Sequence, residues 1–142
     1  MQRTSRFTQG RTLLRLLALV AVMVIMSVAC SGTAPADPSA SLPAGDAQRG
    51  QTLFAESVGG APPCSNCHSL DGSGTDGPTV AGYGAAAASR VSGMSAVAYT
   101  YDSIVHPSAH VVSGYGNLMY NQYGRRLSPQ QIADLIAYLL TL

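Results

Sequence analysis

The 142-residue sequence contains no lysine, no tryptophan and only two phenylalanines, and charged residues make up 11% of it. From position 30 onward, four arginines stand against seven acidic residues, a formal balance of −3. A protein that binds nucleic acid needs a basic patch or stripe on its surface. We therefore expect no nucleic acid among the partners of this chain.

Long apolar runs are also lacking. The longest, residues 16–26, is well short of the ~20 residues that a membrane-spanning helix needs. It follows Arg3, Arg6, Arg11 and Arg15, and a basic segment before a short apolar one is typical of an export signal. Residues 1–29 are therefore predicted to be a signal peptide. A retained signal anchor is the alternative, because apolar residues on either side lengthen the run.

Cysteine is scarce, and the first of the three bears on the type of signal. Cys30 follows Ser27-Val28-Ala29, which resembles a bacterial lipobox, in which the cysteine is lipidated and becomes the mature N-terminus. The same small residues also fit ordinary signal cleavage. Lipidation is favoured because a motif of their own explains the other two cysteines. We expect a lipid anchor on Cys30 that holds the protein at the outer face of the cytoplasmic membrane.

The other two cysteines form the stretch Cys64-Ser65-Asn66-Cys67-His68, the attachment signature of a c-type haem. Each thiol adds to a haem vinyl group, the two-residue gap matches the spacing of the vinyls, and His68 can then bind the iron. A zinc site of four thiolates is excluded by the cysteine count. A redox dithiol, or a zinc site completed by His106 or His110, remains an alternative.

The rest of the chain divides by composition. Residues 30–45 are rich in Ser, Ala, Gly and Pro without a periodic apolar face, which predicts a flexible linker after the lipidated cysteine. Residues 46–142 form one small domain whose thin core a haem would supplement. Helices are predicted after the N-cap Asp46, over 95–105, and after the capping box at Ser128, with a brief helical turn over 85–91. The expected fold is all-α, with three to four helices around one covalent haem c.

Several segments together resemble the class I cytochromes c over the whole domain. Residues 45–54 are similar to the first helix of that family. Gly50 matches the glycine that packs against the last helix, where Leu135 and Tyr138 match the contact pair. Gly77-Pro78 matches the Gly-Pro after the haem motif. The resemblance implies that the Pro78 carbonyl accepts a hydrogen bond from the proximal histidine, which would fix its ring.

The resemblance also implies a distal iron ligand. Residues 114–124 are similar to the loop that supplies it, and this points to Met119, whose soft thioether suits haem iron. Met94 is interpreted as core filler, and His106 and His110, the competitors for the role, as surface loop histidines. Tyr123 of the same loop and Arg125 are further candidate haem contacts. The pair Arg125-Arg126 either binds the haem propionates or is simply solvated.

What is known of the family implies a carrier of single electrons and not an enzyme. Because the chain cannot form the ring of lysines of soluble carriers, we expect a membrane-tethered, periplasmic carrier in a respiratory or photosynthetic chain. Residues 101–107 and the loop after them look most like subunits of quinol-oxidising complexes and terminal oxidases. Such a membrane-bound redox complex is the expected partner. The alternatives are a haem enzyme or gas sensor with an open iron site, and a structural haem subunit.

Overall fold

The computed structural model describes residues 37–73 and 76–142. The predicted signal peptide and Cys30 lie outside the described residues. Within them, no helix is long and apolar enough to cross a membrane. Helices are the only repeating secondary structure of the described residues, which otherwise form loops and turns with one isolated β-bridge between Val58 and Ala61. The all-α prediction is confirmed.

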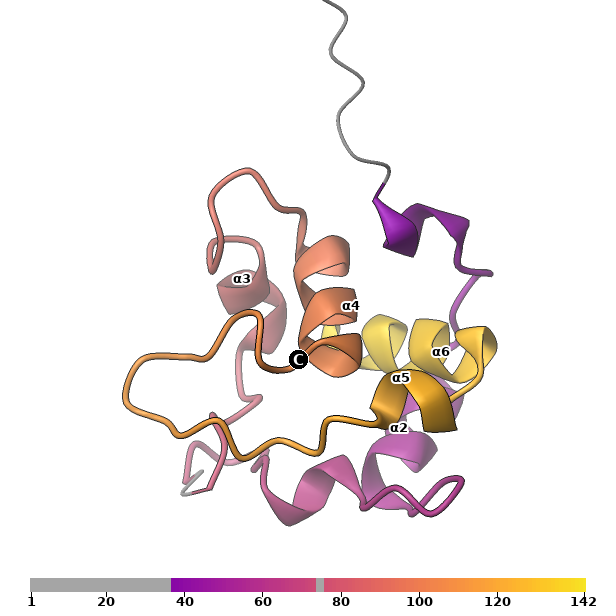
Figure 1. Cartoon of the computed structure of the whole chain (residues 1–142), viewed down its shortest axis with the longest axis horizontal. Helices are drawn as coiled ribbons and strands as arrows, with labels where there is room; N and C mark the ends of the chain where they lie inside the picture. Colours follow the sequence, from indigo (N-terminus) through magenta and orange to yellow (C-terminus); the bar gives the residue numbers. More distant parts are fainter. Residues whose placement is uncertain (1–36, 74–75) are drawn as a thin grey trace, which may run out of the picture. The chain divides into compact units, whose positions relative to one another are not determined.

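Five α-helices and two 3-10 helices make up the described part of the chain (Figure 1). The α-helices are α2 (Ala47–Ala55), α3 (Tyr83–Ala87), α4 (Ala96–Val105), α5 (Tyr123–Arg126) and α6 (Pro129–Leu139), and the 3-10 helices are η1 (Pro38–Ser41) and η2 (Cys64–Asn66). The α-helices exceed the expected three to four because α3 and α5 are very short. The turn expected over 85–91 begins earlier, as α3, and the sequence pattern did not indicate α5.

The predicted helix starts are confirmed. The Asp46 side chain accepts a hydrogen bond from the Arg49 amide at the start of α2. Ser128 and Gln131 form the capping box of α6. Ser95 caps α4, which ends immediately before His106. Each N-cap side chain accepts from an amide that the helix itself leaves without a partner.

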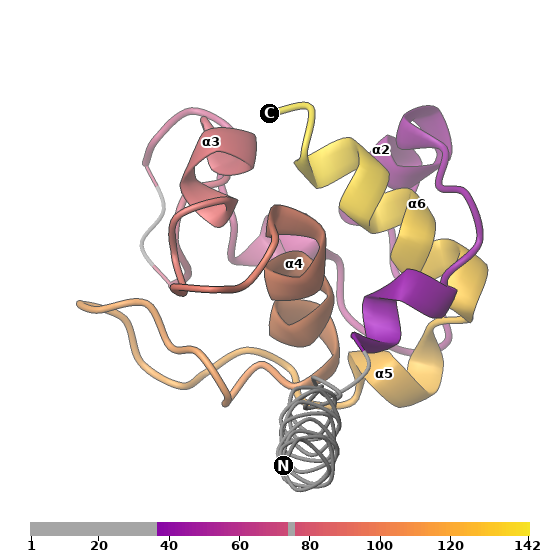
Figure 2. The ribbon, with the colours of Figure 1, turned by 90° about the horizontal axis from the view of Figure 1, so that it is seen from above.

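The first and last long helices, α2 and α6, pack closely (Figure 2). A Cβ on Gly50 of α2 would lie 2.0 Å from the carbonyl oxygen of Asp134 and 2.7 Å from the Cβ of Tyr138, both in α6. Beside this crossing the rings of Phe54 and Tyr138 meet edge to face, with centroids 5.7 Å apart. Only glycine lets the two backbones approach this closely, and the predicted contact between Gly50 and Tyr138 is present.

The flexible-linker prediction is wrong for residues 37–45. Asp37 caps η1 by accepting hydrogen bonds from the amide and the hydroxyl of Ser39, at 2.9 and 2.7 Å. Ser39 is buried, η1 lies against α4, and Leu42 packs against the core. The folded unit therefore begins at Asp37 and not at Asp46. A cap, a proline in the first turn and small residues suffice to dock a segment that has no apolar periodicity.

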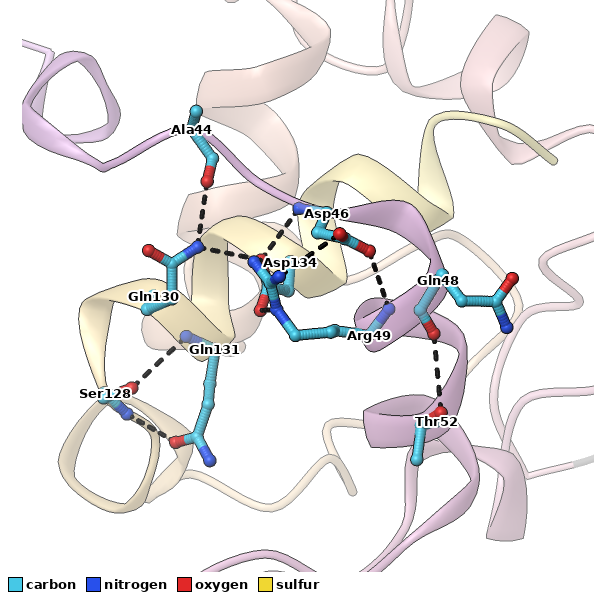
Figure 3. A network of polar contacts seen from close by, with 9 residues as sticks. All are labelled: Ala44, Asp46, Gln48, Arg49, Thr52, Ser128, Gln130, Gln131 and Asp134. Atoms are coloured by element: carbon cyan, nitrogen blue, oxygen red, sulfur yellow. Dashed lines mark hydrogen bonds and ion pairs between the residues drawn. The ribbon is translucent and has the colours of Figure 1, made fainter.

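A buried carboxylate ties this segment to both long helices (Figure 3). Asp134 of α6 is 2% exposed, and it accepts hydrogen bonds from Arg49 Nε and Nη2 at 2.8 and 2.9 Å and from the Asp46 amide at 2.8 Å. Gln130 Nε2 donates both to Asp134 and to the carbonyl of Ala44, each at 2.9 Å. The hydrogen bonds from Arg49 are the main cause that lowers the pKa of Asp134 to about 2.

This pKa yields a prediction for stability. A carboxyl whose pKa is depressed in the folded state stabilises the fold above its ordinary value of 3.8, and that contribution is lost as the pH falls through about 2. Asp134→Asn should lower the free energy of unfolding at pH 7 by on the order of 1–2 kcal/mol, because the partner Arg49 is half exposed and screened. Urea unfolding measured against pH should also show a flatter acid limb. Exposed Glu56→Gln is the control, and an unchanged acid limb in Asp134→Asn would contradict the assignment.

Candidate functional site

A cavity of about 430 Å³ lies within the folded unit. Helices α2 and α6 contribute only apolar side chains to its wall: Phe54, Leu135 and Leu139. Residues 83–110, which run through α3 and α4, contribute many of the polar ones: Tyr83, Arg90, Tyr99, Ser103 and His110. This lining suits a large ligand with an apolar body and a few polar substituents.

The Cys-x-x-Cys-His motif folds as one turn in the cavity wall. Its first three residues form η2, and the amides of Cys67 and His68 both donate to the carbonyl of Cys64, at 3.2 and 3.0 Å. All three side chains line the cavity. The turn therefore presents the two thiols and the imidazole of the motif to the same space.

The imidazole of His68 is held in one orientation. Its Nδ1 lies 2.8 Å from the carbonyl oxygen of Pro78, and because a carbonyl only accepts, Nδ1 carries the proton. A Cβ on Gly77 would lie 2.7 Å from Cε1 of the same ring, so glycine leaves the room that the ring occupies. The predicted bond to Pro78 is present, and it leaves Nε2 as the nitrogen with a free lone pair.

Met119 lines the same cavity and packs, partly buried, against the core. Met94 does not line the cavity, but it is also not among the residues that form the core or pack against it, so its interpretation as core filler is not supported. Aromatic packing holds the segment that carries Met119, since the rings of Tyr120 and Tyr123 meet edge to face with centroids 5.1 Å apart. Tyr123 also lines the cavity, and its buried hydroxyl donates to the carbonyl of Pro62 at 2.8 Å.

The environment of the thiols bears on the two alternatives to haem. Burial raises the pKa of the Cys64 thiol to about 11. Burial is also the largest cause that raises the pKa of the neighbouring Tyr123 hydroxyl. The reactive thiol of a redox dithiol has a lowered pKa, whereas that of Cys64 is raised, which disfavours the dithiol. Nor does any group of three His, Cys, Asp or Glu side chains suited to a metal ion occur among the described residues.

Arginine enters the cavity at an unexpected position. Arg125 and Arg126 are exposed and do not line the cavity, which agrees with the solvated alternative for the pair. Arg90, in the segment between α3 and α4, lines it instead. It belongs to no recognisable motif and was missed. The one sequence feature that distinguishes Arg90 is that it is the only arginine between Gly50 and Gly124.

The two histidines after α4 differ in position. The side chain of His106 is 62% exposed, as expected for a surface residue. His110 was expected to be similar, but its side chain is only 30% exposed and lines the cavity. The expectation is therefore wrong for His110. Its position follows from a contact with α4 that a sequence pattern does not reveal.

A haem fits this set of residues. The wall offers two thiols, an imidazole with a free Nε2 and a thioether, and these are the groups that attach a c-type haem and bind its iron on two sides. The buried hydroxyl of Ser103 also lines the wall and has no hydrogen-bond partner among the described residues. Buried hydroxyls are normally paired, so Ser103 indicates a polar group of a bound ligand, such as a propionate.

Comparison with known proteins agrees with this geometry. The family model described as Cytochrome c matches residues 47–142, about two thirds of the chain. No curated protein and no solved structure matches the chain.

Proposed function

Because the chain belongs to the cytochrome c family, carries a covalent haem c and transfers electrons, we propose which of its residues serve that function and where it operates. Cys64 and Cys67 would form the two thioethers that hold a haem, and His68 and Met119 would bind its iron. Pro78 orients His68, and Tyr123 supports the wall beside Met119. The haem supplies the redox chemistry, while the protein supplies ligands and a shell of low dielectric constant.

The observation that carries this proposal is that one cavity receives all four ligand-bearing side chains. They come from two segments more than 50 residues apart in the sequence. A thioether and an imidazole as the two iron ligands would favour electron transfer, since such a pair would leave no position open and would raise the reduction potential. A haem enzyme or gas sensor would need one of those positions open. We therefore propose a carrier and not an enzyme.

We further propose that the carrier is tethered by a lipid on Cys30 at the outer face of the cytoplasmic membrane. Support comes from the signal-like segment, the lipobox-like residues and the mildly acidic, lysine-free composition. The folded unit begins at Asp37, only seven residues after Cys30. A chain of that length reaches at most about 25 Å. The partner would then be a membrane-bound redox complex within short reach, of the quinol-oxidising or terminal oxidase kind, in a respiratory or photosynthetic chain.

The tether predicts how electron transfer depends on attachment and on salt. Confinement near one surface raises the effective concentration of the carrier to about the millimolar range, so Cys30→Ser should release the protein into the soluble fraction and slow reduction of the membrane acceptor at least tenfold. The rate of the anchored form should change little with ionic strength, because a lysine-free, mildly acidic composition gives weak long-range steering. Stopped-flow kinetics on membranes would measure both effects.

The control is the haem content and spectrum of Cys30→Ser, which should equal those of the native chain. If the soluble variant reacts at the full rate with a steep salt dependence, the protein is a diffusing carrier and the tether is wrong. If the native protein itself shows no haem spectrum, the ligand assignment is contradicted instead.

A further inference from the structure

A single carboxylate binds two histidines at the C-terminal end of α4. Asp102 Oδ1 lies 2.8 Å from Nδ1 of His106, and Asp102 Oδ2 lies 3.1 Å from Nε2 of His110. The contact of His106 is a hydrogen bond, and because a carboxylate at neutral pH only accepts, Nδ1 of His106 carries the proton. The contact of His110 places its ring within ion-pair distance of the same carboxylate, where a proton gained by the ring is stabilised.

The two histidines differ in what else they contact. His106 is mostly exposed, whereas His110 lines the cavity and its ring lies beside that of Tyr99, with centroids 6.2 Å apart. Tyr99 is buried and also lines the cavity. His110 thus has one side in the wall of the haem site and, at 30% exposure, another in contact with solvent. It can exchange protons with water while it responds to charge inside the cavity.

The other charged and titratable groups around His110 keep their charge through neutral pH, apart from His106 and from His68, which serves as an iron ligand. Carboxylates are ionised there, arginine is protonated and phenols are neutral, and burial raises the pKa of Tyr83 further, to about 12. Histidine is the side chain that changes charge between about pH 5 and 8. The groups that share Asp102 or the near wall with His110 are Asp102, Tyr99 and His106 at α4, Tyr83 and Arg90 at and after α3, Asp76 before it, and Tyr115 in the loop after α4. The cavity wall also contains Cys64, Cys67 and His68, which are taken up by the haem, and the phenols Tyr120 and Tyr123.

We propose that His110 binds a proton when the haem is reduced and releases it when the haem is oxidised. A one-electron donor gives one electron to the haem iron, and solvent gives one proton to the imidazole of His110; oxidation reverses both steps. The physical reason is charge: an added electron removes one positive charge from the site and so favours the imidazolium in the adjacent wall. Asp102 is the positioning residue, since it orients the ring and stabilises the imidazolium. The proposal rests on the haem chemistry of the family and not on the tether.

The test is the midpoint potential of the holoprotein as a function of pH. We expect the potential to fall as the pH rises within the range of about pH 5 to 8, with a slope of at most about 59 mV per pH unit, the value for one proton per electron. His110→Gln should remove this dependence. His106→Gln is the matched control, because His106 also contacts Asp102 but does not line the cavity, and this variant should retain the dependence. Asp102→Asn should move the dependence to lower pH.

A second measurement does not depend on any variant. The ring protons of His110, followed by NMR, should titrate at higher pH in the reduced protein than in the oxidised one, while those of His106 should differ less. Identical titration of His110 in the two oxidation states would overturn the proposal. So would a His110→Gln protein that keeps both its haem spectrum and the full pH dependence, since another group would then exchange the proton.

Discussion

Met119→Ala should leave the haem attached but lower its reduction potential by a sizeable part of the roughly 0.8 V range that axial ligands set. Met119 is partly buried in the cavity wall and held by the packing of Tyr120 on Tyr123. A thioether accepts electron density and favours ferrous iron, whereas the water that would replace it does not. The sulfur-to-iron band of the ferric spectrum should disappear, and the potential should fall in a spectroelectrochemical titration.

Met94→Ala is the matched control for this experiment. Met94 is the other methionine of the described chain and does not line the cavity. Its removal should leave both the band and the potential unchanged. The reverse outcome, with Met94→Ala losing the band and Met119→Ala silent, would move the ligand assignment to Met94.

Replacing both Cys64 and Cys67 by serine should prevent haem attachment and unfold the domain. Without the cofactor the cavity of about 430 Å³ has nothing to fill it. At roughly 24 cal/mol per Å³ an empty space of that size costs on the order of 10 kcal/mol, which is comparable to the whole stability of a small domain. Far-UV circular dichroism and proteolysis of the double variant should report an unfolded chain.

Ser65→Ala is the control for that experiment. Ser65 is exposed, and its replacement changes the same turn without removing a thiol. Ser65→Ala should fold and bind haem like the native chain. A double cysteine variant that folds as well as Ser65→Ala would show that the core is sufficient without the haem.

Motifs that act within a few residues of sequence could be predicted. The capping box at Ser128 and the turn at Cys64 depend on local hydrogen bonds, and the same is true of the cap at Asp46. The crossing at Gly50 and the bond from His68 to Pro78 were predicted from the family pattern. In each case the residue type itself indicates the interaction, such as the hydrogen bond of a cap or the close approach that glycine allows.

Positions set by packing between distant segments could not be predicted. Arg90 and His110 reach the cavity because α3 and α4 form its wall, and nothing next to either residue in the sequence shows this. Residues 37–45 look like a linker, yet Gln130 and Asp134, almost 90 positions later, bind their backbone and that of Asp46. Short polar segments of this kind are placed by partners and not by their own periodicity.

The most direct test of the account is the mass of the tryptic peptide that spans residues 50–90. Cleavage after Arg49 and Arg90 releases both Cys64 and Cys67 in this one peptide, since no other arginine and no lysine lies between. The account predicts that the peptide, purified under denaturing conditions, carries the added mass of one haem and absorbs visible light, and that neither cysteine reacts with an alkylating agent. A colourless peptide in which both thiols are alkylated would contradict it.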